Sequence, residues 1–126
     1  MNRSELEKNV IACVARSMAR SEADLTLDTK IMTDLGADSL DFMDIIFQLE
    51  GDLNIQLEKN DFDFLKRTGL SREEAVQNDI LSDEAKKRLA PLLPGLNPAD
   101  NLAPKDLAQF VSIESLVRVL APRFAL

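Results

Sequence analysis

The sequence predicts an all-α fold, and three observations support this class. Apolar residues recur every three or four positions in several stretches, as they do on the buried face of a helix. Most of these stretches follow a serine or aspartate of the kind that caps a helix N-terminus. No stretch shows the alternation of apolar and polar residues that is typical of a half-buried strand. With 126 residues, 45% of them hydrophobic, the chain is expected to form one domain over residues 1–126.

The first helix is expected to follow Ser4 and to end at about Arg20. Ser4 and Glu7 have the spacing of a capping box, in which the two residues exchange hydrogen bonds with each other's backbone. The apolar residues that follow at helical spacing are Leu6, Val10, Ile11, Val14 and Met18.

A long connection over residues 21–37 leads to the second helix. We expect its apolar residues to pack against the bundle; they are Leu25, Leu27, Ile31 and Leu35. Gly36 permits a backbone conformation that other residues resist. Asp38 or Ser39 caps the second helix, which is expected to end at about Glu50 because Gly51 follows. The core stripe of this helix is Phe42, Ile45, Ile46 and Leu49.

Residues 63–104 are expected to contain two short helices. Ser71 and Glu74 form a capping box at the start of the first, which runs to about Asn78. Ser82 caps the second, which ends at Pro94 and Gly95.

Two further elements complete the prediction. Residues 53–57 are interpreted as an extended loop with a few apolar anchors. Ser112 caps a last helix that ends at Pro122, and its apolar residues are Ile113, Leu116, Val117 and Leu120.

The charge of the chain is concentrated around Ser39. The formal net charge is −7, but residues 22–63 alone contain twelve acidic residues and two lysines, a formal charge of −10. Such a field repels nucleic acid and anionic membranes and attracts basic protein surfaces. A solvated, solubilising face is the simpler interpretation of the same pattern.

Composition limits the compartment and the classes of site. The single cysteine, Cys13, excludes an intramolecular disulfide, is interpreted as a packing residue, and favours a reducing, cytoplasmic setting. No secretory signal is expected, and no apolar run approaches the roughly 20 residues of a membrane span. No metal site or catalytic residue is predicted.

Ser39 lies in the run Asp34-Leu35-Gly36-Ala37-Asp38-Ser39-Leu40-Asp41, and three interpretations of it compete. A hydrolytic nucleophile needs a general base, usually histidine, and the chain contains none. A plain N-cap is common at a helix start. The third interpretation is covalent modification, because a helix N-terminus favours a phosphodiester anion.

This run, with the acidic and apolar helix after it, resembles the prosthetic-group site of acyl carrier proteins. The resemblance implies a four-helix bundle and a protein that is not an enzyme. It also implies that Ser39 carries 4′-phosphopantetheine, transferred from coenzyme A by a separate phosphopantetheinyl transferase. The terminal thiol would hold acyl groups as thioesters for fatty acid, lipid or polyketide-type biosynthesis.

The resemblance further implies that the second helix binds partners. Its partner-binding residues would be Asp38, Leu40, Asp41, Met43, Asp44, Phe47 and Glu50, facing the basic docking surfaces of the transferase and of acyl-loading and acyl-using enzymes. Phe42, Ile45 and Leu49 would instead line the core or an acyl cavity, which bulky Phe42 would limit or reshape. The carrier is expected to be a monomer that binds no nucleic acid.

The chain departs from the family in length. Ordinary carriers are shorter, and the excess lies after Phe62, so we expect an insertion at about residues 63–104 with extra short helices. This marks a specialised carrier. Residues 39–47 are also similar to carriers of very long acyl chains for lipid A, and secondary metabolism stays an alternative. The insertion could cap the bundle, enlarge the acyl site or dock one enzyme.

A different class of function also stays open. An acidic helical module for protein interaction, with no prosthetic group, would show the same charge pattern, and Ser39 would then be only part of a helix start.

Overall fold

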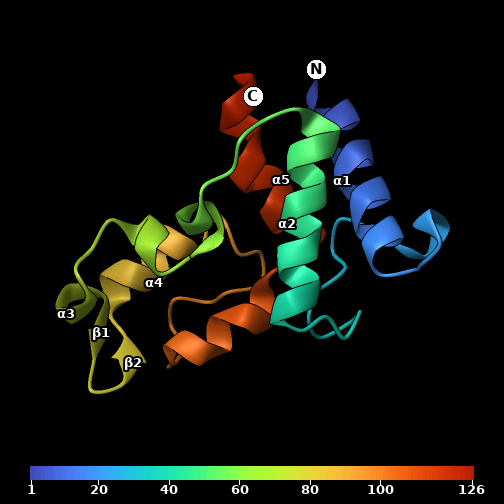
Figure 1. Cartoon of the computed structure of the whole chain (residues 1–126). Coiled ribbons are helices and arrows are strands. Elements are labelled where there is room, and N and C mark those ends of the chain that lie inside the picture. Colours follow the sequence, from blue (N-terminus) through green and yellow to red (C-terminus); the bar gives the residue numbers. More distant parts are fainter.

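Three helices form the centre of the computed structural model, which describes residues 1–126 apart from the side chain of Lys59. Helix α1 (Arg3–Ser17) packs against both α2 (Ser39–Leu53) and α5 (Ile113–Leu120). The chain between α2 and α5 gathers to one side of these helices, away from α1 (Figure 1). Besides its 3₁₀ turns, it contains α3 (Arg72–Ala75), β1 (Val76–Gln77), β2 (Ile80–Leu81) and α4 (Asp83–Leu89). The predicted all-α class is confirmed, with one small hairpin added.

Helix α1 begins two residues earlier than predicted and ends three residues earlier. The predicted box between Ser4 and Glu7 is wrong. Asn2 is the N-cap: its side chain accepts a hydrogen bond from the Glu5 backbone N at 2.8 Å, and Glu5 accepts one from the Asn2 N at 3.2 Å. Both pairs of residues have the box spacing, but Asn2 is the earlier good cap. The helix stops before Ala19, whose φ of 54° cannot continue it.

The connection before α2 is held by buried apolar residues, as predicted. Leu25, Ile31 and Leu35 are buried, and Leu27 packs against the core while partly exposed. It also contains the short 3₁₀ helix η1 (Glu22–Asp24). An isolated bridge pairs it with the residues that precede α5, because the Ile31 N donates to the Val111 carbonyl at 2.9 Å.

Helix α2 continues one turn beyond its predicted end. Gly51 lies within the helix, and the C-cap is Asn54 in the left-handed conformation, with φ of 53°. The prediction that Gly51 ends the helix is wrong because Leu53 falls on the same face as Ile45 and Leu49, and all three are buried. Burial of one more leucine outweighs the low helix propensity of glycine.

The segment after α2 begins with two 3₁₀ turns, η2 (Lys59–Phe62) and η3 (Lys66–Thr68). The predicted box of Ser71 and Glu74 is confirmed, but α3 ends at Ala75 rather than at about Asn78. Asn78 and Asp79 both have positive φ and form a two-residue turn. They pair β1 with β2, with Val76 opposite Leu81. This hairpin is not among the elements predicted from the sequence, and short polar residues tolerate its turn conformation.

Helix α4 follows its predicted cap, Ser82, and ends at Leu89, earlier than the predicted stop at Pro94 and Gly95. The side chains of this region join the same hydrophobic cluster as the three central helices; they include Leu81, Leu89, Leu93, Leu96 and Leu102. The segment is thus packed on the bundle rather than tethered to it.

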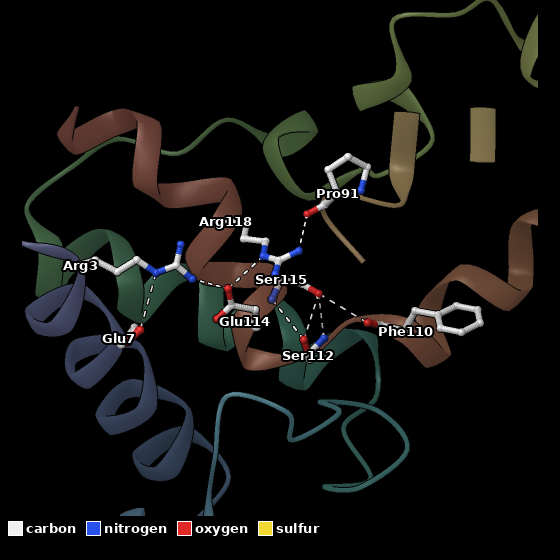
Figure 2. A network of polar contacts seen from close by, with 8 residues as sticks. All are labelled: Arg3, Glu7, Pro91, Phe110, Ser112, Glu114, Ser115 and Arg118. Atoms are coloured by element: carbon white, nitrogen blue, oxygen red, sulfur yellow. Dashed lines mark hydrogen bonds and ion pairs between the residues drawn. The ribbon is translucent and has the colours of Figure 1, made fainter. Parts of the chain in front are cut away.

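A polar network also connects this segment to the bundle (Figure 2). The Glu114 carboxylate pairs with Arg3 of α1 and with Arg118, at 2.9 Å from the Arg118 Nε. Arg118 Nη1 in turn donates to the Pro91 carbonyl at 2.7 Å. The Glu114 side chain is only 12% exposed. Its one negative charge therefore pairs with the positive charges of two guanidinium groups at the edge of the core.

The chain ends with η4 (Pro104–Phe110), α5 and η5 (Ala121–Phe124). The 3₁₀ helix η4 is not among the elements predicted from the sequence. The predicted cap of α5 is confirmed, because Ser112 accepts a hydrogen bond from the Ser115 N at 3.2 Å. Across the described chain, no helix combines the length and the apolar character needed to cross a membrane.

Candidate functional site

Ser39 is the first residue of α2, directly after the N-cap. Asp38 makes the cap: its Oδ1 accepts a hydrogen bond from the Asp41 N at 2.9 Å, and the Asp41 Oδ2 accepts one from the Asp38 N at 3.0 Å. Ser39 is exposed, and no group in the described part of the chain bonds to its hydroxyl. The structure therefore selects Asp38 from the two predicted caps and leaves the Ser39 hydroxyl available.

The turn before Ser39 is tied firmly to the fold. The Gly36 N donates to the Met32 carbonyl at 3.1 Å, and the Ala37 N donates to the Ile31 carbonyl at 3.3 Å. Gly36 has φ of 70°, so its predicted special conformation is confirmed. Leu35 and Ala37 are buried on either side of it. This combination places Ser39 at the surface while Leu35 and Ala37 are fixed in the core.

The site does not have the groups for nucleophilic catalysis. The chain contains no histidine to activate the Ser39 hydroxyl. Cys13 is fully buried, and burial raises the pKa of its thiol to about 11, with the Asp52 carboxylate adding to the effect. A protonated thiol in the core is inert. Among the described side chains, no group of three or more candidate ligands is placed to hold a metal ion.

The outward face of α2 combines exposed apolar side chains with carboxylates. Leu40, Met43 and Phe47 are 75%, 67% and 75% exposed, although residues of this kind are usually buried. Their spacing of three and four places them along one stripe of the helix. Asp38 and Asp44 are exposed on the same helix, while Asp41 and Glu50 are half-buried. Six of the seven residues predicted to bind partners therefore lie on α2, and the seventh, Asp38, is its N-cap.

Several of these carboxylates also have local structural roles. Asp38 and Asp41 share the capping box. The Glu50 Oε2 accepts a hydrogen bond from the Leu57 N at 3.0 Å, and the Asp44 Oδ2 accepts one from the Gln48 side chain at 2.8 Å. A carboxylate that accepts such bonds is held in place, which reduces the entropy lost when a partner binds it.

A shallow groove of about 430 Å³ follows this face of α2. Its lining includes Met43, Phe47 and Glu50, which are three of the predicted partner-binding residues. The other lining residues are Ile46, Leu57 and Glu58. Ile46 was predicted to belong to the core stripe and Leu57 to the following loop, and no role was predicted for Glu58. Helical spacing alone assigns Ile46 to the core, and the turn at Asn54 brings Leu57 back beside it.

A second hollow of about 360 Å³ lies beside η4 and has no counterpart in the sequence analysis. Three separate segments contribute to it: Met32 from the turn before Ser39, residues 62–65 at and after the end of η2, and residues of and next to η4. The lining residues are Met32, Phe62, Asp63, Phe64, Leu65, Pro104, Leu107, Ala108 and Val111. Periodicity within one segment cannot reveal a hollow whose walls come from segments about 30, 40 and 70 residues apart along the chain.

Phe42 lies at the boundary between α2 and this region. It is partly exposed, and its ring meets the Phe62 ring edge to face, with ring centres 6.1 Å apart. Ile45 and Leu49, the other predicted residues of the inner stripe, are fully buried. The inner stripe is therefore part of the packed core.

The chain is similar in sequence to several known proteins. The family model described as "Phosphopantetheine attachment site" matches residues 8–68, which include Ser39. The acyl carrier protein of Exiguobacterium sibiricum is 30% identical over 69 residues, which are 55% of this chain and 87% of that protein. Its counterpart in Amoebophilus asiaticus is 30% identical over 66 residues, 52% of this chain and 82% of that protein. The acyl carrier protein of Thermotoga maritima is 26% identical over 68 residues, which are 54% of this chain and 84% of that protein. No solved structure matches the chain.

Proposed function

Because this chain belongs to the acyl carrier protein family, we propose that Ser39 is the residue that carries its 4′-phosphopantetheine. One observation carries the assignment: within the matched region, the Ser39 hydroxyl is exposed at the start of α2 and is not used by the cap. Proteins of this family are carriers rather than enzymes. When bound, the group supplies a thiol that holds acyl groups as thioesters.

The attachment reaction follows from the chemistry of a free primary hydroxyl. The Ser39 Oγ attacks the phosphorus of coenzyme A that bears the pantetheine, and the bond from this phosphorus to the oxygen of the adenosine bisphosphate breaks. The hydroxyl proton passes to a base of the phosphopantetheinyl transferase, because a histidine is absent from the chain. The new phosphodiester lies at the N-terminus of α2, where the helix dipole favours an anion.

The outward face of α2 is proposed as the docking surface for partner enzymes. Its residues are Asp38, Leu40, Asp41, Met43, Asp44, Phe47 and Glu50. The support is the conjunction of three exposed apolar side chains with the formal charge of −10 over residues 22–63. Basic surfaces on the transferase and on acyl-loading and acyl-using enzymes would complement it. A monomeric carrier in the cytoplasm is the form proposed.

We also propose that the chain is a specialised carrier. The family model ends at residue 68, whereas residues 69–103 add α3, the hairpin and α4 to the same hydrophobic core. This arrangement supports one domain with an insertion at about residues 63–104. Fatty acid, lipid and polyketide-type biosynthesis stay the candidate pathways, with lipid A carriers among them.

Intact-mass measurement tests the assignment. The chain coexpressed with a phosphopantetheinyl transferase should gain the mass of one phosphopantetheinyl group, and Ser39→Ala should abolish the gain. Ser4→Ala is the matched control, since Ser4 is also an exposed serine near the start of a helix. An unchanged mass with several transferases would contradict the proposal and favour an acidic interaction module.

A further inference from the structure

The extra segment contains a lysine that is almost completely buried. The side chain of Lys86, in α4, is only 4% exposed, although lysine is rarely buried unless its ammonium group is paired. Among the described residues, the Lys86 Nζ has two partners. It donates a hydrogen bond to the Asp100 carbonyl at 2.8 Å, and it lies 3.4 Å from the Asp83 Oδ1.

These two partners do not use the whole bonding capacity of the ammonium group. It has three N–H donors, and the Asp100 carbonyl accepts from one of them. The distance to Asp83 is longer than the roughly 2.8 Å of a charge-assisted hydrogen bond. The Asp83 side chain is also 88% exposed, so its carboxylate is mostly solvated and the ion pair is weak. Because a buried donor without an acceptor costs free energy, an acceptor from outside the chain is favoured here.

Lys86 belongs to the lining of a polar pocket of about 210 Å³. Its walls come from the hairpin of β1 and β2, from the start of α4, and from Asn101. A backbone hydrogen bond joins two of these walls, because the Leu81 N donates to the Leu102 carbonyl at 2.7 Å. The hairpin itself is fixed by the pairing of its strands. The pocket is therefore built by the fold.

The rest of the lining supplies further donors and one exposed apolar side chain. Gln77, Asn78 and Asn101 are exposed, and their carboxamides each carry two N–H donors. Within the described chain, no hydrogen bond engages these carboxamides, so a ligand can bind them without breaking a bond of the fold. Ile80 is 39% exposed and lines the same pocket.

This set of groups fits a carboxylate on a short aliphatic stem. The two oxygens of a carboxylate accept several hydrogen bonds at once, which suits an ammonium group beside carboxamide donors. Asp83 lines the pocket as well, and its charge opposes a phosphate dianion more than a carboxylate with one charge. The aliphatic stem of the ligand would contact Ile80.

We propose that the pocket between the hairpin and α4 binds a carboxylate with a short aliphatic stem, and that Lys86 is its counter-ion. The carboxylate belongs to a free organic acid or to an acidic side chain of a bound protein. The site does not depend on Ser39: its residues lie outside the region matched by the family model, and Figure 1 shows the hairpin away from α2. A ligand here would leave the proposed docking surface of α2 uncovered.

NMR of the full-length protein with ¹³C-labelled lysine tests the site, with sodium butyrate as the probe at constant ionic strength. Butyrate should shift the ε-methylene signal of Lys86 until it saturates. Butyramide, which has the same stem without the charge, should leave the signal in place. Absence of a saturable shift with butyrate, or equal shifts with both compounds, would overturn the inference.

A second probe distinguishes the two sources of the carboxylate. It is glutamate with an acetylated N-terminus and an amidated C-terminus, which presents an acidic side chain as a protein does. Tighter binding of this compound than of butyrate supports a protein side chain as the ligand. Weaker binding supports a free acid.

Variants provide an independent measurement through the side-chain amide signal of Asn78. Lys86→Gln should abolish butyrate binding, and Lys87→Gln, at the exposed neighbouring position, should retain it. Asp83→Asn removes the competing carboxylate and should raise the affinity for butyrate roughly two- to fivefold. If Lys86→Gln does not fold, Asp83→Asn and Asn101→Ala decide the question. A rise in affinity for the first and a fall for the second are expected, and unchanged affinity in both would contradict the site.

Discussion

Asp38 caps α2 and Ser39 is the proposed attachment residue, and these separate roles lead to a quantitative prediction. In the structure the Asp38 side chain caps α2, and the Ser39 side chain contributes no hydrogen bond to the helix start. Asp38→Ala should therefore lower the free energy of unfolding, whereas Ser39→Ala should leave it nearly unchanged. The two positions are adjacent, so the comparison separates a role in capping from a role in modification.

The magnitude follows from the bonds that each variant removes. Asp38→Ala removes the acceptor of the 2.9 Å bond from the Asp41 N and leaves that donor without its partner. Loss of a cap of this kind costs about 1 kcal/mol. For a chain of this size, 1 kcal/mol corresponds to roughly 3–5 °C in melting temperature. Ser39→Ala at the first helical position should change stability by less than about 0.5 kcal/mol, since alanine is a good helix former.

Urea unfolding followed by circular dichroism measures both effects on the unmodified protein. Asp38→Asn is the control, because asparagine caps as well as aspartate while it removes one negative charge. It should retain most of the stability and still reduce the rate of modification by a transferase at low salt. A loss of stability in Ser39→Ala equal to that in Asp38→Ala would refute the assignment of the cap and of the free hydroxyl.

Three further predictions concern charge, the buried thiol and the polar network. Asp44→Lys on the exposed face of α2 should slow modification of Ser39, with an effect that shrinks at high salt because screening weakens the attraction between exposed charges; rates that are equal at all salt concentrations would contradict the docking surface. Cys13 should resist alkylation by iodoacetamide in the folded protein and react on unfolding. Because burial raises its pKa from 9.0 to about 11, the unfolded chain loses this proton first, so stability should fall as the pH rises from 9 to 11, and this fall should be smaller in Cys13→Ala. Glu114→Gln should cost about 1 kcal/mol in urea unfolding, because it weakens the pairing with two arginines at a mostly buried carboxylate. Glu84→Gln, which breaks an exposed pair with Arg88, should cost less than half as much, and equal losses would show that the network has no special role.

Local signals predicted most of the helices correctly. The predicted caps at Ser71, Ser82 and Ser112 are confirmed. They could be predicted because each is a short-range hydrogen bond from a backbone amide to a side-chain oxygen three residues earlier. The inward side of α2 was predicted from spacing alone, and Ile45 and Leu49 are fully buried. Errors arose at helix ends, where two caps compete or where burial extends a helix past a glycine, as at Gly51.

The candidate site divides in the same way. The run around Ser39 could be singled out because it is continuous in sequence, and the partner-binding residues of α2 followed from the resemblance to acyl carrier proteins. The hollow beside η4 was not, since its walls come from three segments that only the fold brings together. The hairpin of β1 and β2 was missed because each strand has two residues, too few for any period to be recognised.

The amino-acid order by itself determined that a serine begins an acidic helix whose inner side is apolar, because helical spacing and capping act within a few residues. The tertiary structure alone decided how far the helix runs and where an apolar hollow opens beside its start. Those outcomes depend on burial against distant parts of the chain, and burial is a property of the packed whole.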